Sequence, residues 1–467
     1  MKRLTRRSFL SVSAATLASP AIGAPAPAVD TEVIIIGAGA AGIAAARRLS
    51  VAHRRFVLLE AADRIGGRCV TDTAIFGAPF DLGAHWIYSP ETNPLIKLGP
   101  KTGFDFDQSS TRLNLRVGRR EARDSELEDF LGTRVRANHA LEDAARARND
   151  GSAADALPRD LRDWRPTIEF LLGAYGCGRE LREVSAFDYA KAIDRDRGAF
   201  CRQGYGALLA KLGAVVPARL STPVTRIEWR DRVTVETEKG RLVGSSAIIT
   251  ASTAVLLSGD IKFSPDLPKR QLDALASLKL GSFDHVALEL AGSPLGTDPD
   301  KFVFEKAAGN RTAALLANIS GTSLATVSLG GNFGRELSRA GNAAMVDFAV
   351  EWLAGLYGSD IKKAVKRTHA TRWSENPYMR GALATASPGK SGARKTLMEP
   401  LQDKIYFAGE AVNETNWGTV GGAWESGSRA AEAILRKLGV LKDPEEPRAS
   451  QPPKSAPKSS GEPRKKS

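Results

Sequence analysis

Apolar runs separated by a glycine-rich turn and a helical pattern define the start of the chain. Residues Val33 to Ile36 form a continuous β-branched run, which is typical of a parallel strand buried on both faces. A glycine-rich turn follows at once, residues 43–50 have a helical pattern, and residues 56–59 form a second apolar run. This order predicts a Rossmann-like domain of the α/β class, with a buried parallel sheet.

The pattern changes after residue 95. Charged segments of helical appearance occupy residues 126–150 and 167–172. Strand-like runs follow at 285–290 and 312–318, with a helical pattern at 343–357. We therefore expect a second domain that combines a mixed sheet with helices, so that the whole chain is α+β.

The glycine-rich turn indicates a dinucleotide site. It reads Gly37-Ala38-Gly39-Ala40-Ala41-Gly42, and its small residues Gly37, Gly39, Ala41 and Gly42 allow a tight turn, a close approach to pyrophosphate and close helix packing. Glu60 ends the second strand, where its carboxylate would accept hydrogen bonds from a ribose diol. The turn alone does not distinguish NAD from FAD.

The residues that follow resemble the flavin amine oxidase family. Asp63 to Arg68 is similar to the second phosphate-contacting loop of that family, and Asp81 to Ile87 to its loop beside the flavin. Further similar segments begin at Gln203, Ile405 and Gly418, so the resemblance covers about residues 31–436. It implies FAD as the cofactor, bound by Gly37, Gly39, Ala41, Gly42, Glu60, Arg68, Gly83, Ala84, His85, Trp86, Val224, Gly409, Glu410, Thr419, Val420 and Ala423.

The resemblance also implies two discontinuous domains. The FAD-binding domain would consist of residues 31–95, 203–284 and 391–440. The substrate domain would consist of residues 96–202 and 285–390. The expected fold is the amine oxidase and glutathione reductase type. Ala382 stands about where covalently flavinylated monoamine oxidases have a cysteine, so we expect non-covalent FAD.

Four residues are candidates for the substrate side: His285, Trp373, Tyr378 and Thr419. Trp373 and Tyr378 belong to a segment that crosses the substrate face in the family, where an electron-rich ring suits an amine. Leu383 and Thr419 replace the two facing tyrosines of monoamine oxidases, a gap that Tyr378, Trp417 or Trp424 could fill. His285 stands where many members have a lysine; a histidine can hold a water and titrates near neutrality.

These similarities predict an FAD-dependent amine oxidase. Hydride would pass from an amine carbon to flavin N5, and the resulting imine would hydrolyse to a carbonyl compound. Oxygen would accept the electrons and give hydrogen peroxide, or a quinone or cytochrome would replace it. The same fold also serves L-amino-acid oxidases, which need an arginine such as Arg380 or Arg311 for the substrate carboxylate, and carotenoid or protoporphyrinogen oxidoreductases. A flavin-binding protein without turnover is the remaining alternative.

Composition and charge exclude several other classes. The net charge of +13 is concentrated partly at the two ends, and no nucleic-acid-binding motif accompanies it. No apolar run reaches the 18 to 20 or so residues that a membrane-spanning helix needs. The three cysteines and five histidines lack metal-ligand spacing, so we expect no metal site and no disulfide framework.

The two ends have sequences of their own. Residues 1–28 resemble a twin-arginine signal peptide, with Arg6 and Arg7 before a weakly apolar stretch and cleavage expected after Ala24 or Ala28. The resemblance implies the twin-arginine export machinery as a partner and a periplasmic location. Residues 443–467 contain Pro, Ser, Lys and Glu with almost no apolar side chains, which predicts a disordered tail.

Overall fold

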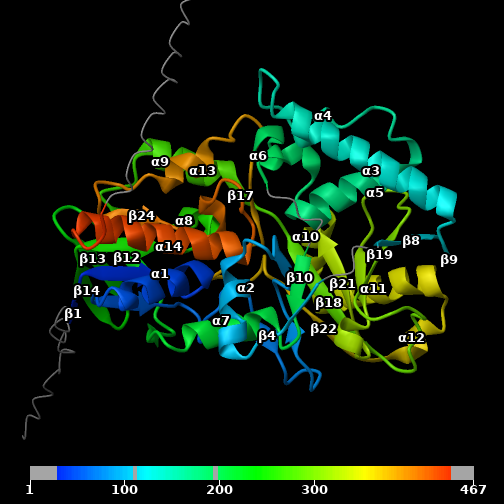
Figure 1. Cartoon of the computed structure of the whole chain (residues 1–467), viewed down its shortest axis with the longest axis horizontal. Helices are drawn as coiled ribbons and strands as arrows, with labels where there is room; N and C mark the ends of the chain where they lie inside the picture. Colours follow the sequence, from blue (N-terminus) through cyan, green and yellow to red (C-terminus); the bar gives the residue numbers. More distant parts are fainter. Residues whose placement is uncertain (1–28, 109–112, 193–197, 443–467) are drawn as a thin grey trace, which may run out of the picture.

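The computed structural model describes residues 29–108, 113–192 and 198–442. The predicted signal and tail lie outside the described residues. The molecule is elongated, with the parallel sheet and helices α1 (Ala40–Val51) and α14 (Val420–Lys437) toward one end (Figure 1). A larger sheet with α10 (Gly331–Ala340) and α11 (Asn342–Tyr357) lies toward the other. The order of elements confirms the expected fold class, in which a parallel nucleotide-binding sheet is combined with a second, mixed sheet.

The parallel sheet has β2 at its centre. Its strand order is β11 (Ala218–Arg219), β3 (Phe56–Leu59), β2 (Val33–Ile36), β15 (Ser246–Ile249) and β24 (Ile405–Phe407), and every neighbouring pair is parallel. All four residues of β2 are buried. Burial on both faces explains the uninterrupted β-branched run, because a central strand has no solvent side to place polar residues on.

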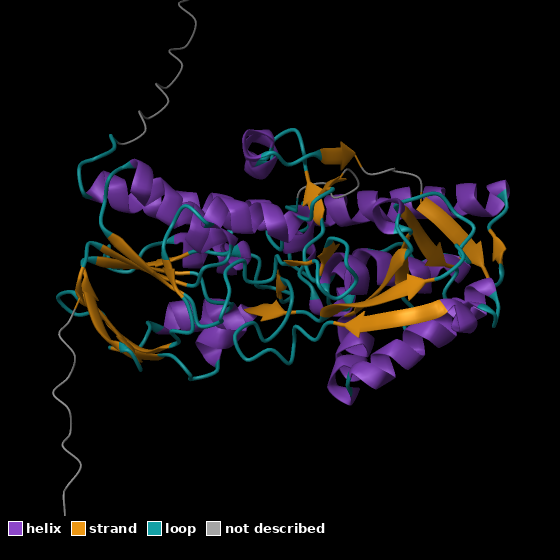
Figure 2. Cartoon of the chain, turned by 90° about the horizontal axis from the view of Figure 1, so that it is seen from below, coloured by secondary structure: helices purple, strands orange, loops and turns teal. Residues whose placement is uncertain are grey.

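Helices and a second sheet cover the two faces of this parallel sheet. On one face α1 (Ala40–Val51) packs along α14 (Val420–Lys437), with α7 (Tyr205–Gly213) beside them (Figures 1 and 2). On the other face Ile34 and Ile36 share a core with Ile227 and Val235 of the second sheet. That sheet has the order β1 (Val29–Asp30), β14 (Gly240–Gly244), β13 (Val233–Thr237), β12 (Val224–Glu228) and β16 (Lys262–Ser264).

The larger sheet has seven strands. Their order is β22 (Val365–Ala370), β18 (Phe283–Leu290), β21 (Leu324–Gly330), β20 (Ala314–Ala317), β19 (Lys301–Glu305), β8 (Leu113–Val117) and β9 (Arg120–Glu121). Only the β19–β8 pair is parallel among these strands. Helices α10 (Gly331–Ala340) and α11 (Asn342–Tyr357) pack against one face through an apolar core. The opposite face is free to line a cavity.

The helical segment before residue 190 differs from expectation in two places. Helix α3 spans Asp124–Ala144, so the helix predicted over 126–150 ends earlier, before the polar run Arg146 to Asp150. The helix predicted over 167–172 is divided between α5 (Arg165–Glu169) and a π-helical turn, η3 (Phe170–Tyr175). A π turn leaves no signature in hydrophobic periodicity, because it shifts the register by one residue within a continuous helix.

Short elements complete the described fold. The strands are β4 (Thr71–Asp72), β5 (Phe80–Asp81), β6 (Trp86–Tyr88), β7 (Phe106–Gln108), β10 (Gly198–Cys201), β17 (Leu278–Leu280) and β23 (Ala384–Ala386). The helices are α2 (Pro94–Leu98), α4 (Ala153–Ala156), α6 (Ala186–Ala190), α8 (Thr253–Leu257), α9 (Lys269–Ser277), α12 (Ile361–Ala364) and α13 (Ala393–Met398). The 3₁₀ turns are η1 (Pro100–Thr102), η2 (Arg162–Trp164), η4 (Leu181–Glu183), η5 (Ile319–Gly321) and η6 (Glu410–Val412).

The limits of the two domains remain a prediction. Strand β18 begins at Phe283, just ahead of the predicted limit between residues 284 and 285. None of the helices in the described ranges is both long enough and apolar enough to cross a membrane.

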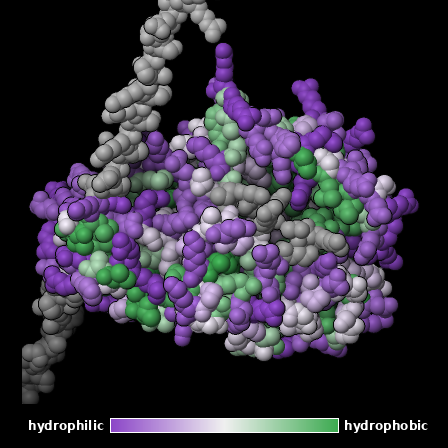
Figure 3. Space-filling view, in the orientation of Figure 1, coloured by the Kyte–Doolittle hydropathy of each residue, from purple (hydrophilic) through white to green (hydrophobic). Residues whose placement is uncertain are grey.

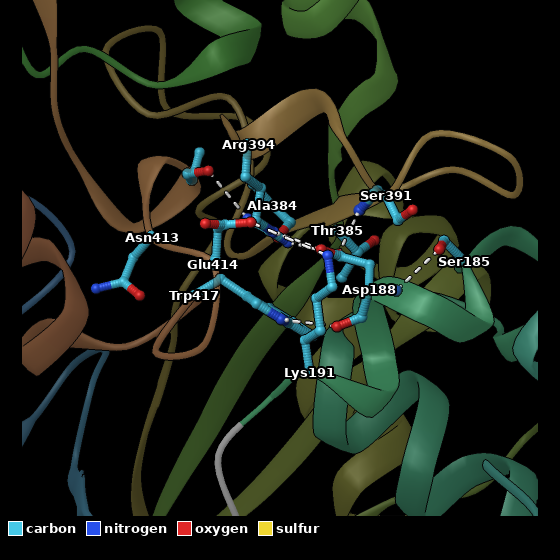
Figure 4. Close-up of polar contacts among 12 residues, drawn as sticks. Ser185, Asp188, Lys191, Ala384, Thr385, Ser391, Arg394, Asn413, Glu414 and Trp417 are labelled. Carbon is cyan, nitrogen blue, oxygen red and sulfur yellow. Dashed lines mark hydrogen bonds and ion pairs between the residues drawn. The ribbon is translucent and has the colours of Figure 1, made fainter. Parts of the chain in front are cut away.

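A buried ion pair joins α6 to α13. Arg394 donates from Nε to Asp188 Oδ1 at 2.7 Å and from Nη2 to Oδ2 at 2.8 Å, and both side chains are about 1% exposed (Figure 4). Arg394 also donates to the carbonyl oxygens of Ala384 and Ala411 and lies over the Trp417 ring. The pair therefore holds together elements that are far apart in sequence, and both of its side chains are hydrogen-bonded to the backbone of β23.

Candidate active site

A cavity of about 540 Å³ lies between the parallel sheet and the seven-stranded sheet. It is within the usual size range of cofactor and ligand sites. Of the predicted cofactor and substrate residues, Gly42 does not line it and the others do; they are Gly37, Gly39, Ala41, Glu60, Arg68, Gly83, Ala84, His85, Trp86, Val224, His285, Trp373, Tyr378, Gly409, Glu410, Thr419, Val420 and Ala423. The fold thus brings predicted residues from most of the chain together at one cavity.

The glycine turn forms one end of the cavity. Gly37 has φ of +103°, a conformation that side chains disfavour, and a Cβ there would lie 2.4 Å from Thr250 Oγ1. A Cβ on Gly42 would lie 1.9 Å from the Gly37 carbonyl oxygen, so its role is close packing between helix and turn. No side chain caps α1 at Gly39, which leaves its first N–H groups free to bind a phosphate.

Glu60 is held beside this turn. Its Oε2 accepts from the Ala38 amide at 2.7 Å, and its Oε1 accepts from the Ala62 amide at 2.9 Å. Burial raises the pKa of Glu60, while these two amide bonds lower it. Each oxygen keeps a further acceptor position, so the carboxylate can hold a ribose diol as predicted.

Arg68 and Glu410 form a pair that the sequence did not indicate. Arg68 Nη1 lies 3.3 Å from Glu410 Oε1 and also donates to the Ala382 carbonyl oxygen. Glu410 Oε2 accepts from the Ala384 and Gly418 amides at 3.2 and 3.1 Å. The sequence analysis predicted both as cofactor-binding residues, but not as partners of each other. In the structure their ion pair holds together two loops that follow different strands.

The loop from Gly83 to Trp86 is held by close backbone contacts. A Cβ on Gly83 would lie 2.1 Å from the Arg68 carbonyl oxygen and 3.0 Å from Trp373 Cζ2. Trp373 Nε1 donates to the Leu82 carbonyl oxygen at 3.2 Å. Trp373 is buried and supports this loop from the substrate side.

Asp81 is a site residue that the sequence analysis did not select. Its Oδ2 accepts from His85 Nδ1 at 2.9 Å, and its two oxygens accept from the amides of Tyr205 and Gly206 at 3.2 and 3.3 Å. Asp81 therefore joins the flavin-side loop to the N-terminus of α7, where a negative charge is favourable. Its position at the start of the Asp-Leu-Gly segment was the available signal.

His285 is a neutral, fully bonded ring. Its Nε2 donates to the Gly83 carbonyl oxygen at 3.2 Å, so its Nδ1 accepts from Ser328 Oγ at 3.1 Å. Burial lowers the pKa of His285 to about 4. The expectation that it titrates near neutrality is wrong, because the ring is desolvated. Its role in holding a water stays a prediction, and both ring nitrogens already have protein partners.

Tyr378 lies in a different environment from Trp373. Its side chain is 43% exposed, and its segment contacts the nucleotide-binding domain through the bond from Ser252 Oγ to the Met379 carbonyl oxygen. Among the residues suggested as replacements for an aromatic pair, Trp417 and Trp424 belong to apolar cores and do not line the cavity. Leu383 and Thr419 both line it.

The C-terminal helix points its first turn at the cavity. Thr419 is the N-cap of α14: its Oγ1 accepts from the Gly422 amide at 2.9 Å and donates to the Asn416 carbonyl oxygen at 2.8 Å. Val420 and Ala423 line the cavity beside it. The positive end of the helix dipole is therefore directed at the site.

Five aromatic residues form what we call the aromatic wall: Trp86, Tyr88, Tyr175, Phe283 and Phe302. Trp86 was predicted as a cofactor residue, and the sequence analysis missed the other four. The Trp86 and Phe302 ring centroids are 4.9 Å apart, and Tyr175 makes edge contacts with Phe283 at 5.6 Å and Phe302 at 5.9 Å. Tyr175 ends the π turn η3, so periodicity could not indicate its direction.

Comparison with known proteins decides the family. A family model described as flavin containing amine oxidoreductase matches residues 40–435. The chain belongs to this family. Accordingly, FAD is the cofactor for which the glycine turn and the paired loops are built.

Similar members of the amine oxidoreductase family include two kinds of curated protein. Lysine-specific histone demethylase 1 homolog 2 of Oryza sativa subsp. japonica is 29% identical over 91% of this chain and 59% of that protein. Polyamine oxidase 4 of the same organism is 26% identical over 88% of this chain and 90% of that protein. The chain spans less than two thirds of the length of the histone demethylases that it matches.

Solved structures of amine oxidases share the fold. Cyclohexylamine oxidase from Brevibacterium oxydans IH-35A superposes with a TM-score of 0.74 at 23% identity, covering 88% of this chain and all of that one. A putrescine oxidase bound to putrescine superposes with a TM-score of 0.75 at 19% identity over the same shares.

The two arginines considered for an amino-acid oxidase do not meet that need. Arg311 pairs with Glu336, lies over the Phe333 ring and is not part of the cavity lining. Arg380 is paired with Asp260 at 2.7 Å. Neither arginine therefore supports the alternative that this amine oxidoreductase is an L-amino-acid oxidase.

Proposed function

We propose that this protein is an FAD-dependent amine oxidase. The observation that carries the proposal is one continuous cavity, which runs from the phosphate-binding turn to the aromatic wall. When bound, FAD supplies hydride acceptance at N5 from the carbon beside the amine nitrogen, which leaves an imine that hydrolyses to a carbonyl compound.

The residues present fit FAD. Glu60 provides a buried carboxylate for a ribose, and the uncapped start of α1 provides amides for the pyrophosphate. The first turn of α14 directs positive potential into the same cavity, where it would stabilise the negative charge of a reduced flavin.

The chain's own part in catalysis is positioning and exclusion of water. The aromatic wall gives an apolar surface that favours the neutral amine over the ammonium form, because desolvation penalises charge. His285 stays neutral, so it adds no repulsive charge beside the amine. No side-chain nucleophile is needed for this chemistry.

We further propose that FAD is held without a covalent bond. Ala382, which lines the cavity, has no nucleophilic atom. The two cysteines in the lining are buried, and burial raises the pKa of Cys69 well above its ordinary value and that of Cys201 to about 12. Neither thiol would form the thiolate that attack on the flavin requires. Acid precipitation of the protein should release all yellow colour into the supernatant.

Anaerobic titration tests the proposed activity. The flavin absorbance should bleach when a suitable amine is added without oxygen, and the product mixture should contain the matching carbonyl compound. Bound flavin that no amine or amino acid bleaches would contradict the proposal and favour a flavin-binding protein without turnover.

The proposal also covers the cellular location of the protein and the electron acceptor that reoxidises its flavin. The Arg6-Arg7 pair supports export by the twin-arginine machinery to the periplasm, where oxygen, a quinone or a cytochrome would accept the electrons. Rapid recovery of the flavin colour on admission of air would identify oxygen. Replacing Arg6 and Arg7 by lysine should retain the protein in the cytoplasm, as measured by cell fractionation.

A further inference from the structure

Where the cavity lies beneath the seven-stranded sheet, the described strands of that sheet contribute no anionic side chain to its lining. The strands of that sheet contribute to its lining Phe283, His285, Phe302, Leu316, Thr326 and Ser328. Phe302 and Leu316 are apolar, His285 is neutral, and Ser328 is bonded to His285. Tyr175 from η3 closes the same end with a neutral phenol, because burial raises its pKa well above the ordinary value.

The carboxylates that do line the cavity have other partners or another location. Asp81 is 2% exposed and accepts from His85 and two amides, and Glu410 is paired with Arg68. Asp260 is paired with Arg380. Glu60 holds the first strand-to-helix turn, and the last carboxylate, Glu238, follows β13 in the nucleotide-binding domain.

The remaining charged group in the lining is a cation. Arg202, which follows β10, binds Asp107 through Nε at 2.5 Å and Nη2 at 3.0 Å. Asp107 balances the charge of this guanidinium, so the pair offers no free counter-ion to a substrate ammonium.

We infer that the substrate is a monoamine with a flat apolar substituent, not a diamine or polyamine. This inference rests on the proposed function and names its substrate class. A second ammonium would be buried against the aromatic wall without a counter-ion, which is unfavourable. A ring or a planar hydrocarbon fits the wall, because the rings of Trp86, Tyr175 and Phe302 offer both faces and edges at 4.9 to 5.9 Å centroid spacing.

Matched substrate pairs test the charge argument. The first pair is 4-methylbenzylamine and 4-(aminomethyl)benzylamine, and the second is hexylamine and 1,6-diaminohexane. Within each pair the shape is similar and one member adds a second ammonium. At pH 8 we expect kcat/KM for flavin reduction to favour hexylamine over 1,6-diaminohexane by about a hundredfold, since the second alkyl amine, with a pKa of about 10.4, must first lose its proton. The benzylic pair should show a smaller preference of the same sign, because benzylic amines are less basic. The preference should shrink by about tenfold from pH 8 to pH 9.

The outcomes separate the inference from the proposed function. Equal values within each pair, or faster reduction by the diamine, overturn the substrate class while leaving an amine oxidase. Flavin that neither member of any pair bleaches overturns the proposed function, and the substrate class falls with it.

A substitution in the aromatic wall tests the shape argument. Phe302→Leu should lower kcat/KM for 4-methylbenzylamine by about three- to tenfold more than for propylamine, as expected from the loss of an aromatic contact. Phe348→Leu is the matched control, because Phe348 is also half-buried but packs on Phe333 away from the cavity. An equal loss for both amines, with flavin content unchanged, would show that Phe302 does not contact the substrate and would contradict the inference.

Discussion

At the scale of single residues, burial favours the neutral forms of two neighbours on β18. His285 faces the cavity and stays neutral, whereas Asp284 is fully buried and accepts from the Trp373 amide at 2.7 Å and from Thr371 Oγ1 at 3.2 Å. Burial raises the pKa of Asp284 to about 6. Alternation along a strand predicts that adjacent residues point to opposite faces, but it does not say which face is solvated.

Asp284→Asn should stabilise the protein more at pH 7.5 than at pH 4. The folded pKa of Asp284, about 6, exceeds its ordinary value of 3.8. The protonated form therefore contributes stability below pH 3.8 that is lost as pH rises to 6. Asparagine does not titrate. The free energy of unfolding of the variant, relative to that of the wild type, should therefore increase by about 2 to 3 kcal/mol from pH 4 to pH 7.5. Denaturant unfolding of both proteins at the two pH values measures this, and a difference independent of pH would contradict it.

His285→Gln should leave the pH dependence of flavin reduction unchanged between pH 6 and 9. The pKa of His285, about 4, keeps the ring neutral throughout this range. Glutamine can retain the bonds to the Gly83 carbonyl and Ser328, because it has one donor and one acceptor group. Stopped-flow reduction rates across the range test this. Loss of a kinetic pKa in the variant would show that His285 titrates in the working enzyme.

At the scale of elements, α1 and α14 pack with almost no space between their backbones. A Cβ on Gly427 of α14 would lie 2.0 Å from the Ala41 carbonyl oxygen of α1. The two helices direct their first turns at the cavity, so this contact fixes the two cofactor-facing helix ends relative to each other. The apolar pattern over residues 43–50 predicted a helix there, but not that α14 touches it.

Gly427→Ala should therefore destabilise the protein by at least 2 kcal/mol and weaken FAD binding. Gly132→Ala in α3 is the matched control, because a Cβ there would meet only the flexible Arg136 side chain at 3.9 Å. The control should be neutral or stabilising by up to about 1 kcal/mol, as alanine has the higher helix propensity. Thermal unfolding and flavin content check both variants, and equal effects would contradict the packing argument.

At the scale of the whole molecule, sequence patterns predict the nucleotide-binding end well and the aromatic wall at the other end poorly. The β2–turn–α1–β3 unit and Glu60 follow from local patterns, because each residue acts within a single supersecondary unit. The aromatic wall combines residues from β6, η3, β18 and β19, and only the three-dimensional fold brings these together. The Arg68 to Glu410 pair was missed for the same reason: its residues are separated by most of the chain.

The face of the molecule in Figure 3 is mainly hydrophilic, with small separate hydrophobic areas. The buried Arg394 to Asp188 pair is an exception to the apolar interior that local sequence could not predict.

Asp188→Asn should destabilise the whole protein by about 3 to 5 kcal/mol, because it leaves the Arg394 guanidinium buried without its counter-charge. Asp360→Asn is the control, since its partner Lys363 is exposed and the pair is solvated. Only the first variant should lower the unfolding midpoint. If the two variants unfold alike, water or another group must compensate the buried charge.

The order of strands in the parallel sheet has a consequence for how the protein is made. Strand β15 lies between β2 and β24, and α14 follows β24 and packs on α1. Synthesis proceeds from the N-terminus, so the ribosome must complete residues beyond 420 before the first strand-turn-helix unit has all its neighbours. A chain that is still being synthesised therefore lacks α14 beside α1 and has no enclosed cavity, so FAD can be retained only once the fold is complete.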